Sequence, residues 1–457
     1  MNIDEPTPEI SAWKSRWQTV RDVVAGEYQI KLGRETYLPR GRTGQGDIEY
    51  EKYLGDTPFY PATARTAQGK KGLMFAANVV LQASDEFEQI KETITANGMS
   101  IRELAEEVVW ETLQTNFTGL LVEHGSKPEG VELNGENAIE EGYRPFIHLY
   151  PAETILEATY GVVRNRKQLV RVRVMESKDR VLELLNRNGI YIQRIHNRSN
   201  GKWTFEEVIP DKDGVPFREI PFVIISDNNK ACPQPSVLED IVRLNLNHYR
   251  KQGKISAIHM FVSGVIPYIA GIVPENGEDG KPKQPQISFN NQGYIVVPDA
   301  NTKFGFWEPD GKQIESLERE RQHYEEQMAK VGARMLAPER VAPEAEATVA
   351  LRSAAEDSTN ASLALRYASR FSKALTFASR WLDGTEATYT LNTDYQNRTM
   401  NAQEMTAALA MVQAGQISWR TFFFMLRDRK VVNATLTPEE ERTNIEQDNI
   451  DRPTAEL

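Results

Sequence analysis

The sequence contains a single cysteine, Cys232. One thiol excludes an intrachain disulfide and leaves no cysteine-based zinc site. No apolar run approaches the roughly 18 residues that a membrane-spanning helix needs. The acidic, polar N-terminal segment does not resemble a secretory signal. These absences predict a soluble protein that stays inside a cell or a particle and has no membrane partner.

Sequence patterns that mark common active sites are also missing. The chain has no G-x-x-x-x-G-K-[ST] loop, no G-x-S-x-G elbow and no H-E-x-x-H helix. The Gly-rich stretch Gly41–Gly46 follows no predicted strand and lacks the dinucleotide-binding spacing, so we expect a flexible loop there. The sequence therefore predicts no enzyme, no catalytic residue and no cofactor.

Candidate metal ligands are sparse. Most of the six histidines lie in predicted strands or within helices, without an acidic partner at ligand spacing. We expect His248 to be a packed or interface histidine. Acidic clusters at Asp85, Glu86 and Glu88 and at Glu106–Glu107 leave open a metal-dependent nuclease, because carboxylates bind Mg²⁺. Solvated helix faces produce the same clusters, and we therefore expect no metal site.

A surplus of positive charge is absent as well, since the formal net charge is −11. Proteins that grip nucleic acid usually present a basic surface. The charge therefore argues against a protein that reads a DNA sequence, whereas a protein past which DNA slides is still allowed. Hydrophobic residues make up 40% of the chain, enough for a real core, and 457 residues suggest about two to four domains.

The spacing of apolar residues in the N-terminal half changes once, from a helical pattern to the alternation typical of strands. Residues Pro61–Phe75 read as a helix interrupted by Gly69 and Gly72, and a further helix is predicted to begin at Ser100, where Glu103 completes a capping box. From about Gly119 to Ser226 the period becomes two, in short runs rich in β-branched and aromatic residues. This pattern predicts a half-buried antiparallel sheet and an α+β, mainly helical fold.

The middle of the chain predicts two long helices around a small β insert. Ser236 and Glu239 suggest a capping box for a helix of about 25 residues, and Asp310 with Gln313 suggests the cap of a second. Strand-like pieces VIPYIAGIV and QGYIVVPD lie between them. The second helix has one apolar stripe in which Arg321 takes a polar slot: Ile314, Leu317, Tyr324, Met328, Val331 and Met335.

The remainder is predicted to be helical apart from one strand, TYTLNTDY. A helix rich in small residues runs from about Ala345 to Leu382. Three C-terminal helices follow, at Asn401–Ala414, from Ser418 to about Arg429, and from Thr437-Pro438 onward.

Three segments resemble the portal proteins of tailed bacteriophages, in a branch known as a domain of unknown function. The most specific is Pro235–Arg250, which reads PSVLEDIVRLNLNHYR. Leu351–Ser358 with Arg380–Leu382 is similar to the family's small-residue helix, and Arg65–Phe75 to its N-terminal pattern. Together these segments cover most of Pro61 to Leu382 in the family's order.

The resemblance implies a portal-like architecture, in a ring usually of twelve subunits at one capsid vertex. Such a subunit has an α/β wing, a two-helix stem, a small β clip, a long post-loop helix and a helical crown. Mapped onto this sequence, the wing is 1–235, stem helix 1 is 236–261, the clip is 262–311, stem helix 2 is 312–336, the channel or tunnel loop is 337–346, the long wing helix and return strand are 347–398, and the crown is 399–457.

The resemblance further implies a function without catalysis, in a virion assembled in the host cytoplasm. The ring forms the channel for genome packaging and ejection, passes double-stranded DNA without reading its sequence, and binds terminase, major capsid protein and tail adaptor. Expected DNA-lining residues are Lys330, Arg334 and Arg340, although Lys330 and Arg334 can instead pair with acidic neighbours on the same helix or the next subunit. Channel-loop residues are Pro338, Glu339, Val341 and Pro343, and clip docking residues are Asn276, Glu278, Asp279, Lys281 and Lys283.

Two non-enzymatic alternatives share this lack of chemistry. Another virion connector or adaptor protein is the nearer one, but adaptors are usually shorter and lack two helices of about 25 residues around a β insert. A cellular helical scaffold fits the helices and not the ordered matches.

Overall fold

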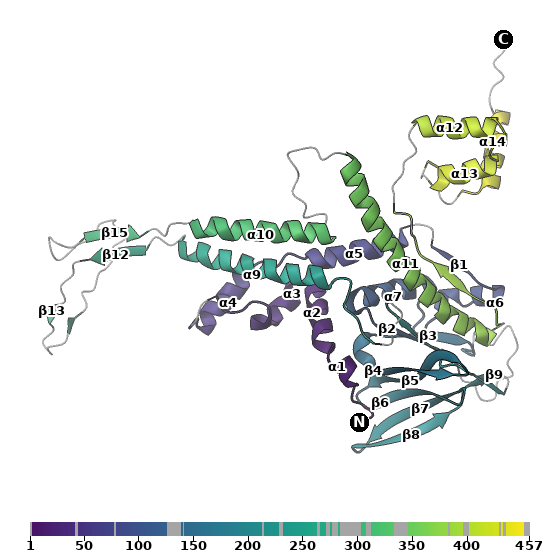
Figure 1. Ribbon diagram of the computed structural model, residues 1–457, viewed down its shortest axis with the longest axis horizontal. Coiled ribbons are helices and arrows are strands. Elements are labelled where there is room, and N and C mark those ends of the chain that lie inside the picture. Colours follow the sequence, from purple (N-terminus) through teal and green to yellow (C-terminus); the bar gives the residue numbers. More distant parts are fainter. Residues whose placement is uncertain are drawn as a thin grey trace, which may run out of the picture. The chain divides into compact units, whose positions relative to one another are not determined.

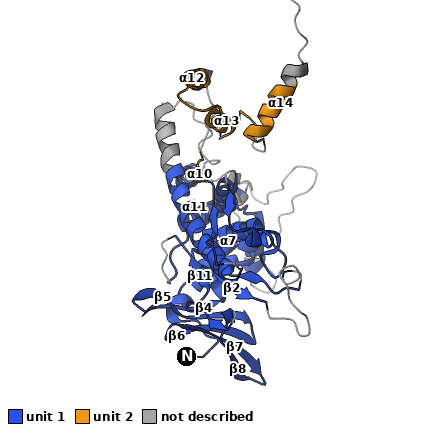
Figure 2. Ribbon diagram, turned by 90° about the vertical axis from the view of Figure 1, so that its right-hand side faces the viewer, with its two compact units in different colours: residues 1–392 blue, residues 393–457 orange. Residues whose placement is uncertain are grey.

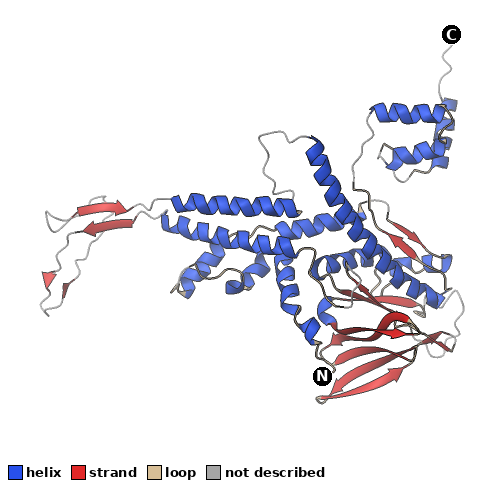
Figure 3. Ribbon diagram, viewed as in Figure 1, coloured by secondary structure: helices blue, strands red, loops and turns tan. Residues whose placement is uncertain are grey.

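The computed structural model describes most of the chain in two compact units, Met1–Asn392 and Thr393–Leu457 (Figure 2). The described residues are 2–41, 44–76, 79–125, 139, 141–212, 214–227, 232–262, 266–270, 275–276, 282–283, 303–307, 312–332, 346–382, 384–395, 402–428, 431–432 and 436–451. Helices and antiparallel sheets occur together in the first unit (Figure 3), which confirms the α+β class.

Short helices form the N-terminal part of the first unit. Ser100 and Glu103 make the predicted capping box, and the apolar face of the helix that follows is buried. The predicted interruption at Gly69 and Gly72 is wrong: the helix is continuous, because Ala67, Met74 and Phe75 are buried and hold it in place. The helices are α1 Pro8–Ser11, α2 Lys14–Ala25, α3 Glu27–Leu32, α4 Asp47–Asp56, α5 Ala62–Phe75, α6 Asp85–Glu88 and α7 Ile101–Thr115.

Among the described residues, two larger antiparallel sheets and the short pair β9 Asp211–Lys212 and β10 Val215–Pro216 account for the predicted period-two region. One has the order β11-β2-β3, with β2 Thr118–His124, β3 Pro145–Tyr150 and β11 Phe222–Ile225. The other is a meander in which every strand pairs with its neighbours in sequence. The short runs recognised in the sequence did not include two of its strands, Ile155–Val163 and Arg180–Arg187. Its strands are β4 Ile155–Val163, β5 Arg166–Ser177, β6 Arg180–Arg187, β7 Ile190–Ser199 and β8 Lys202–Val208.

A row of alternating charges crosses the meander in register. Glu157, Arg173, Glu183, Arg194 and Glu207 stand directly opposite one another, one on each strand from β4 to β8. Arg173 Nε lies 2.7 Å from Glu157 Oε2, and Arg194 Nε lies 2.8 Å from Glu207 Oε2. Opposite charges placed directly across from each other stabilise a sheet.

Glu183 at the centre of this row is buried. Burial alone would raise its pKa, but hydrogen bonds from His196 and Arg171 outweigh burial and hold the pKa below its usual value. Neighbouring Arg173 is only 1% exposed and donates to the carbonyl oxygens of Asn2 and Ile3. The N-terminal residues therefore cover the Arg173–Glu157 pair, whereas the Arg194–Glu207 pair remains partly exposed.

The long helices of the first unit are α9 Glu239–Val262, α10 Lys312–Val331 and α11 Glu346–Leu382. Between α9 and α10, β12 Ile266–Ala270 pairs antiparallel with β15 Lys303–Trp307, and β13 Glu275–Asn276 with β14 Pro282–Lys283. The predicted small β insert is therefore present. Its expected second strand, QGYIVVPD, lies outside the described residues, and β15 comes after that segment.

Helix α11 packs along the β11-β2-β3 sheet (Figure 1). Large side chains such as Tyr367, Phe371 and Leu375 are buried on this side, and Ala374 and Ala378 between them are fully buried. Small residues at these positions let the helix approach the sheet closely. After α11, the predicted single strand is β16 Thr388–Thr390, which pairs with β1 Val80–Gln82.

The described residues of the second unit form three helices close to the predicted ranges: α12 Ala402–Gln413, α13 Trp419–Asp428 and α14 Pro438–Asp451. Gly415 follows α12 with φ +69°, the left-handed conformation that glycine adopts most easily after a helix. Before α14, Thr437 and Glu440 bond reciprocally, side chain to backbone N–H, in a capping box.

Candidate functional site: the helix pair α9 and α10

Helix α9 begins without the predicted capping box. The hydroxyl of Ser236 donates to the carbonyl of Leu113 at 2.8 Å and accepts from the N–H of Leu238 at 3.0 Å. The carboxylate of Glu239 bonds Arg16 of α2 at 2.5 Å. Partners from α7 and α2 therefore replace the local bonds that the sequence pattern suggested, and they fix the start of α9 on the N-terminal helices.

Asn245 anchors the next turn of α9 and is fully buried. Its side-chain oxygen accepts from the N–H of Thr63 at 3.1 Å and from the hydroxyl of Thr63 at 3.0 Å. Its amide nitrogen donates to the carbonyl of Tyr60 at 2.9 Å. One side chain therefore satisfies three polar groups at the start of α5, which ties α9 to this part of the core.

Further along, α9 packs closely on α4. Tyr249 is fully buried and meets Phe59 edge to face, with ring centroids 5.4 Å apart. A Cβ at Gly253 would lie 2.5 Å from the Tyr53 hydroxyl and 2.8 Å from Leu38 Cδ1, so only glycine fits there without movement of its neighbours. This region of α9 is therefore packed closely onto the N-terminal helices.

Helix α10 lies beside α9 (Figure 1), and polar contacts as well as apolar ones join the two helices. His248 Nε2 lies 3.0 Å from Glu325 Oε1. The Arg321 guanidinium donates to Gln252 Oε1 at 3.1 Å, and Lys251 pairs with Glu320. Arg321 thus occupies the polar slot that the sequence predicted within the stripe.

The predicted apolar stripe of α10 is confirmed over most of its length. Met328 is fully buried, and Ile314, Leu317 and Tyr324 are partly buried. Val331 departs from the prediction, since 42% of its surface is exposed. Met335 lies outside the described residues. The apolar stripe thus faces α9, and its last described residue, Val331, is exposed to solvent at the end of α10.

His248 makes the helix pair sensitive to pH. Burial lowers the pKa of His248 below its ordinary value of 6.5, although the bond to Glu325 partly opposes this. The unfolded chain therefore binds a proton more readily than the folded chain as the pH falls below 6.5, and protonation favours unfolding.

We expect the melting temperature to fall between about pH 7.5 and pH 5.5, and to fall less in His248→Gln. Differential scanning calorimetry at the two pH values measures this difference. The exposed His323 on α10 provides the control: His323→Gln should keep the full wild-type loss. An equal loss in wild type and His248→Gln would contradict the assignment.

The side of α10 away from α9 is largely exposed. Among the described elements, α9 is the only extensive neighbour of α10. Near the C-terminal end of α10, a shallow groove of about 350 Å³ lies between the two helices. Leu244 and Val331 provide its apolar lining; its polar residues are Asp240, Arg243, Gln327 and Lys330.

Of the predicted DNA-lining residues, the structure describes Lys330, which is exposed at this groove. Of the predicted docking residues, it places Asn276 on β13 and Lys283 on β14. Among the described residues, the structure brings no other predicted site residues into contact with one another. Outside it lie Arg334, Arg340, Pro338, Glu339, Val341, Pro343, Glu278, Asp279 and Lys281.

The acidic clusters give no metal centre where the structure describes them. Asp85, Glu86 and Glu88 lie in α6, where Glu88 pairs with Lys91 at 2.6 Å. Within the described ranges, no group of three or more His, Cys, Asp or Glu side chains is placed to hold a metal ion. Nor does any described helix combine the length and the apolar character needed to cross a bilayer.

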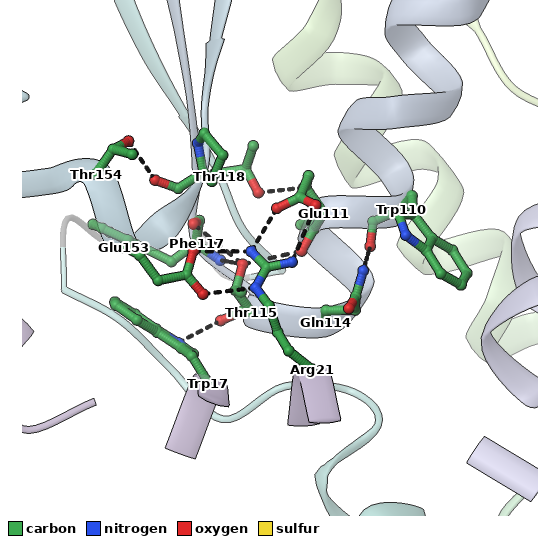
Figure 4. A network of polar contacts seen from close by, with 12 residues as sticks. Trp17, Arg21, Trp110, Glu111, Gln114, Thr115, Phe117, Thr118, Glu153 and Thr154 are labelled. Carbon is green, nitrogen blue, oxygen red and sulfur yellow. Dashed lines mark hydrogen bonds and ion pairs between the residues drawn. The ribbon is translucent and has the colours of Figure 1, made fainter. Parts of the chain in front are cut away.

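A partly buried cluster of ion pairs around Arg21 was not identified from the sequence. Arg21 of α2 lies between Glu111 of α7 and Glu153, with N–O distances of 2.6 Å to each (Figure 4). Burial would lower the pKa of Arg21, but the hydrogen bonds that its guanidinium donates to both carboxylates reverse this and raise the pKa. Beside it, the Trp17 indole donates to the carbonyl of Thr115 at 3.1 Å. No local pattern links these residues.

Comparison with known proteins gives distant similarities. Among curated proteins, none matches the chain. A solved chain from the "neck of empty GTA particle computed with C6 symmetry" is similar over 86% of this chain and 98% of its own, with 14% identity and a TM-score of 0.42. A chain from the "virion of native gene transfer agent (GTA) particle" is similar over 85% and 95%, with 12% identity and a TM-score of 0.38. Residues 237–382, which span α9 to α11, match the family model described as a domain of unknown function (DUF4055).

Proposed function

We propose that this chain is a structural subunit of a phage-type virion, a portal that joins copies of itself into a ring and connects head to tail. The observation that carries the proposal is the helix pair. Two long helices linked through a small β ribbon lie side by side, and α10 has one extensive neighbour among the described elements. Within the described part of the chain, its opposite face is polar and exposed, so another copy could bind there.

The way α9 is held supports this role. Asn245 and Gly253 tie it to the N-terminal helices at two separate positions. A helix fixed in this way can carry α10 and the β ribbon at a constant angle in every copy. Constant geometry is what a closed ring of identical subunits requires.

In the proposed particle, the ring is usually of twelve copies and occupies one capsid vertex. Double-stranded DNA passes through its centre during packaging and ejection without being read. The net charge of −11 fits a channel that does not hold DNA strongly. Terminase and a tail adaptor are the proposed partners of the β12–β15 end, and the major capsid protein surrounds the ring. We propose no catalytic step for this chain.

Electron microscopy of the purified full-length protein tests the proposal. Negative-stain images are expected to show rings with a central hole, and light scattering should give a mass that is a multiple of 51.9 kDa. A uniform monomer at all protein concentrations would contradict the proposal. A short, open oligomer without a bore would favour another connector protein. Mg²⁺-dependent DNA cleavage lost in Asp85→Asn/Glu88→Gln would favour the nuclease alternative.

A further inference from the structure

Two exposed apolar surfaces lie on either side of α9. The first, which we call the α3–α4 face, consists of Tyr28, Leu32 and Ile48, which are 78%, 57% and 90% exposed. The second is the groove between α9 and α10, lined by Leu244 and Val331. Large exposed apolar side chains grouped on one face mark interaction sites more often than isolated ones do.

Polar contacts between α3 and α4 hold the α3–α4 face in place. Lys31 of α3 donates to the carbonyl of Gly55 at the end of α4 at 2.9 Å. Arg34, just after α3, pairs with Glu51 of α4. Tyr50 and Tyr53 on the inner side of α4 are buried. Ile48 therefore projects from a fixed helix into solvent.

The two surfaces carry opposite charge. On α4, the exposed Ile48 stands among Asp47, Glu49, Glu51 and Asp56. Arg40 pairs with Asp47 and Arg34 with Glu51, so the acidic excess of this face comes from Glu49 and Asp56 against Lys52. In the groove, the apolar residues stand beside Arg243 and Lys330, against a single acidic residue, Asp240. An apolar centre with a rim of matching charge is the usual composition of a protein interface.

Their placement suits contact between copies. Helix α4 packs on one side of α9, and α10 lies on the other (Figure 1). Two different surfaces on opposite sides of a subunit can join identical copies head to tail. Such contacts produce a ring when the rotation from each copy to the next brings the last copy back to the first. A two-fold dimer would instead require one surface to match itself.

We infer that the α3–α4 face of one copy binds the α9–α10 groove of the next copy, with Ile48 against Val331 and Leu244. Acidic α4 side chains then face Arg243 and Lys330. This contact rests on the proposed ring and names the residues that form it. In this contact, Lys330 pairs with acidic residues of the next subunit, which is the alternative to DNA contact that the sequence left open.

Charge substitution tests the contact in the intact protein. Ile48→Glu should weaken association at least about tenfold, because it places a carboxylate in an apolar, acid-rimmed contact. The matched control is Val162→Glu, a residue 74% exposed on β4 of the meander. Light scattering over a dilution series should show monomers for the first variant and rings for the second. Circular dichroism spectra that match wild type would show that both fold.

Cross-linking tests which surfaces meet. In a Cys232→Ser background, we expect a short bis-maleimide to convert Ile48→Cys/Val331→Cys into a ladder of covalent multimers on a denaturing gel. Each single-cysteine variant alone should stay monomeric on that gel, and a mixture of the two should stop at dimers. Covalent dimers of Ile48→Cys alone would indicate a two-fold contact and overturn the inference.

The outcomes separate this inference from the proposed function. Rings that survive Ile48→Glu without a ladder would refute the α3–α4 contact and leave the ring in place. A wild-type protein that is monomeric would refute both. Rings lost in Ile48→Glu together with a ladder from the double-cysteine variant would support both.

Discussion

Replacing Asn245 with leucine is expected to lower the free energy of unfolding by about 3 kcal/mol. Leucine has a similar size, but it removes three hydrogen bonds at once. The N–H and hydroxyl of Thr63 and the carbonyl of Tyr60 then remain buried without their partner. Urea unfolding followed by circular dichroism measures the loss.

The half-buried Asn247 on the same helix provides the control for this substitution. Asn247→Leu should change stability by less than about 1 kcal/mol. Asn245→Asp gives a second check, because its added carboxylate oxygen would face the Tyr60 carbonyl. Protonation removes that repulsion, so Asn245→Asp should regain stability relative to wild type as the pH falls. Equal losses in the two leucine variants would contradict the anchoring role.

Arg21→Met is expected to cost about 3 kcal/mol. The substitution leaves Glu111 and Glu153 facing each other, partly buried, with the positive charge between them gone (Figure 4). Repulsion between the two carboxylates adds to the lost hydrogen bonds. Thermal unfolding monitored by calorimetry gives the size of the effect.

Arg16, on the same helix, is the matched control. Its side chain is 46% exposed where it pairs with Glu239. An exposed ion pair contributes little, so Arg16→Met should cost less than about 1 kcal/mol. Adding Glu111→Gln and Glu153→Gln to Arg21→Met should recover part of the loss, because the repulsion disappears. Further destabilisation by these two changes would contradict this explanation.

Local signals in the sequence predicted those elements whose causes are local. Ser100 with Glu103, and Thr437 before α14, cap helices through bonds within a few residues. Ser236 with Glu239 has the same pattern and fails. There the helix start lies against α7 and α2, and the carbonyl of Leu113 and the guanidinium of Arg16 provide partners. Tertiary contacts decide which of two identical patterns becomes a cap.

Long-range partners could not be predicted from one sequence. Asn245 reaches Thr63 across 182 residues of sequence, and Arg21 reaches Glu111 and Glu153 across 90 and 132 residues. Likewise, no histidine had a predicted acidic partner, yet His248 meets Glu325 on another helix. Periodicity predicts which face of a helix or strand a residue occupies. Its contact partner on another element depends on how the helices and strands pack.

The stripe on α10 marks the limit of periodicity. Its spacing correctly predicted one apolar face with a polar slot at Arg321, and the structure packs that face on α9. Val331 continues the same spacing but remains exposed. The pattern alone cannot distinguish a position that packs within the chain from one left for a neighbour.

The neighbour-to-neighbour order of the meander has a consequence for how the chain reaches its native state. Hairpins from β4 to β8 close short loops, so they can form early with little loss of chain entropy. Strand β11 must instead return across the whole meander to pair Phe222 with Leu121. The meander is therefore suited to form early, and we expect β11 and the later helices α9 and α11, whose side chains also enter the core, to pack after it.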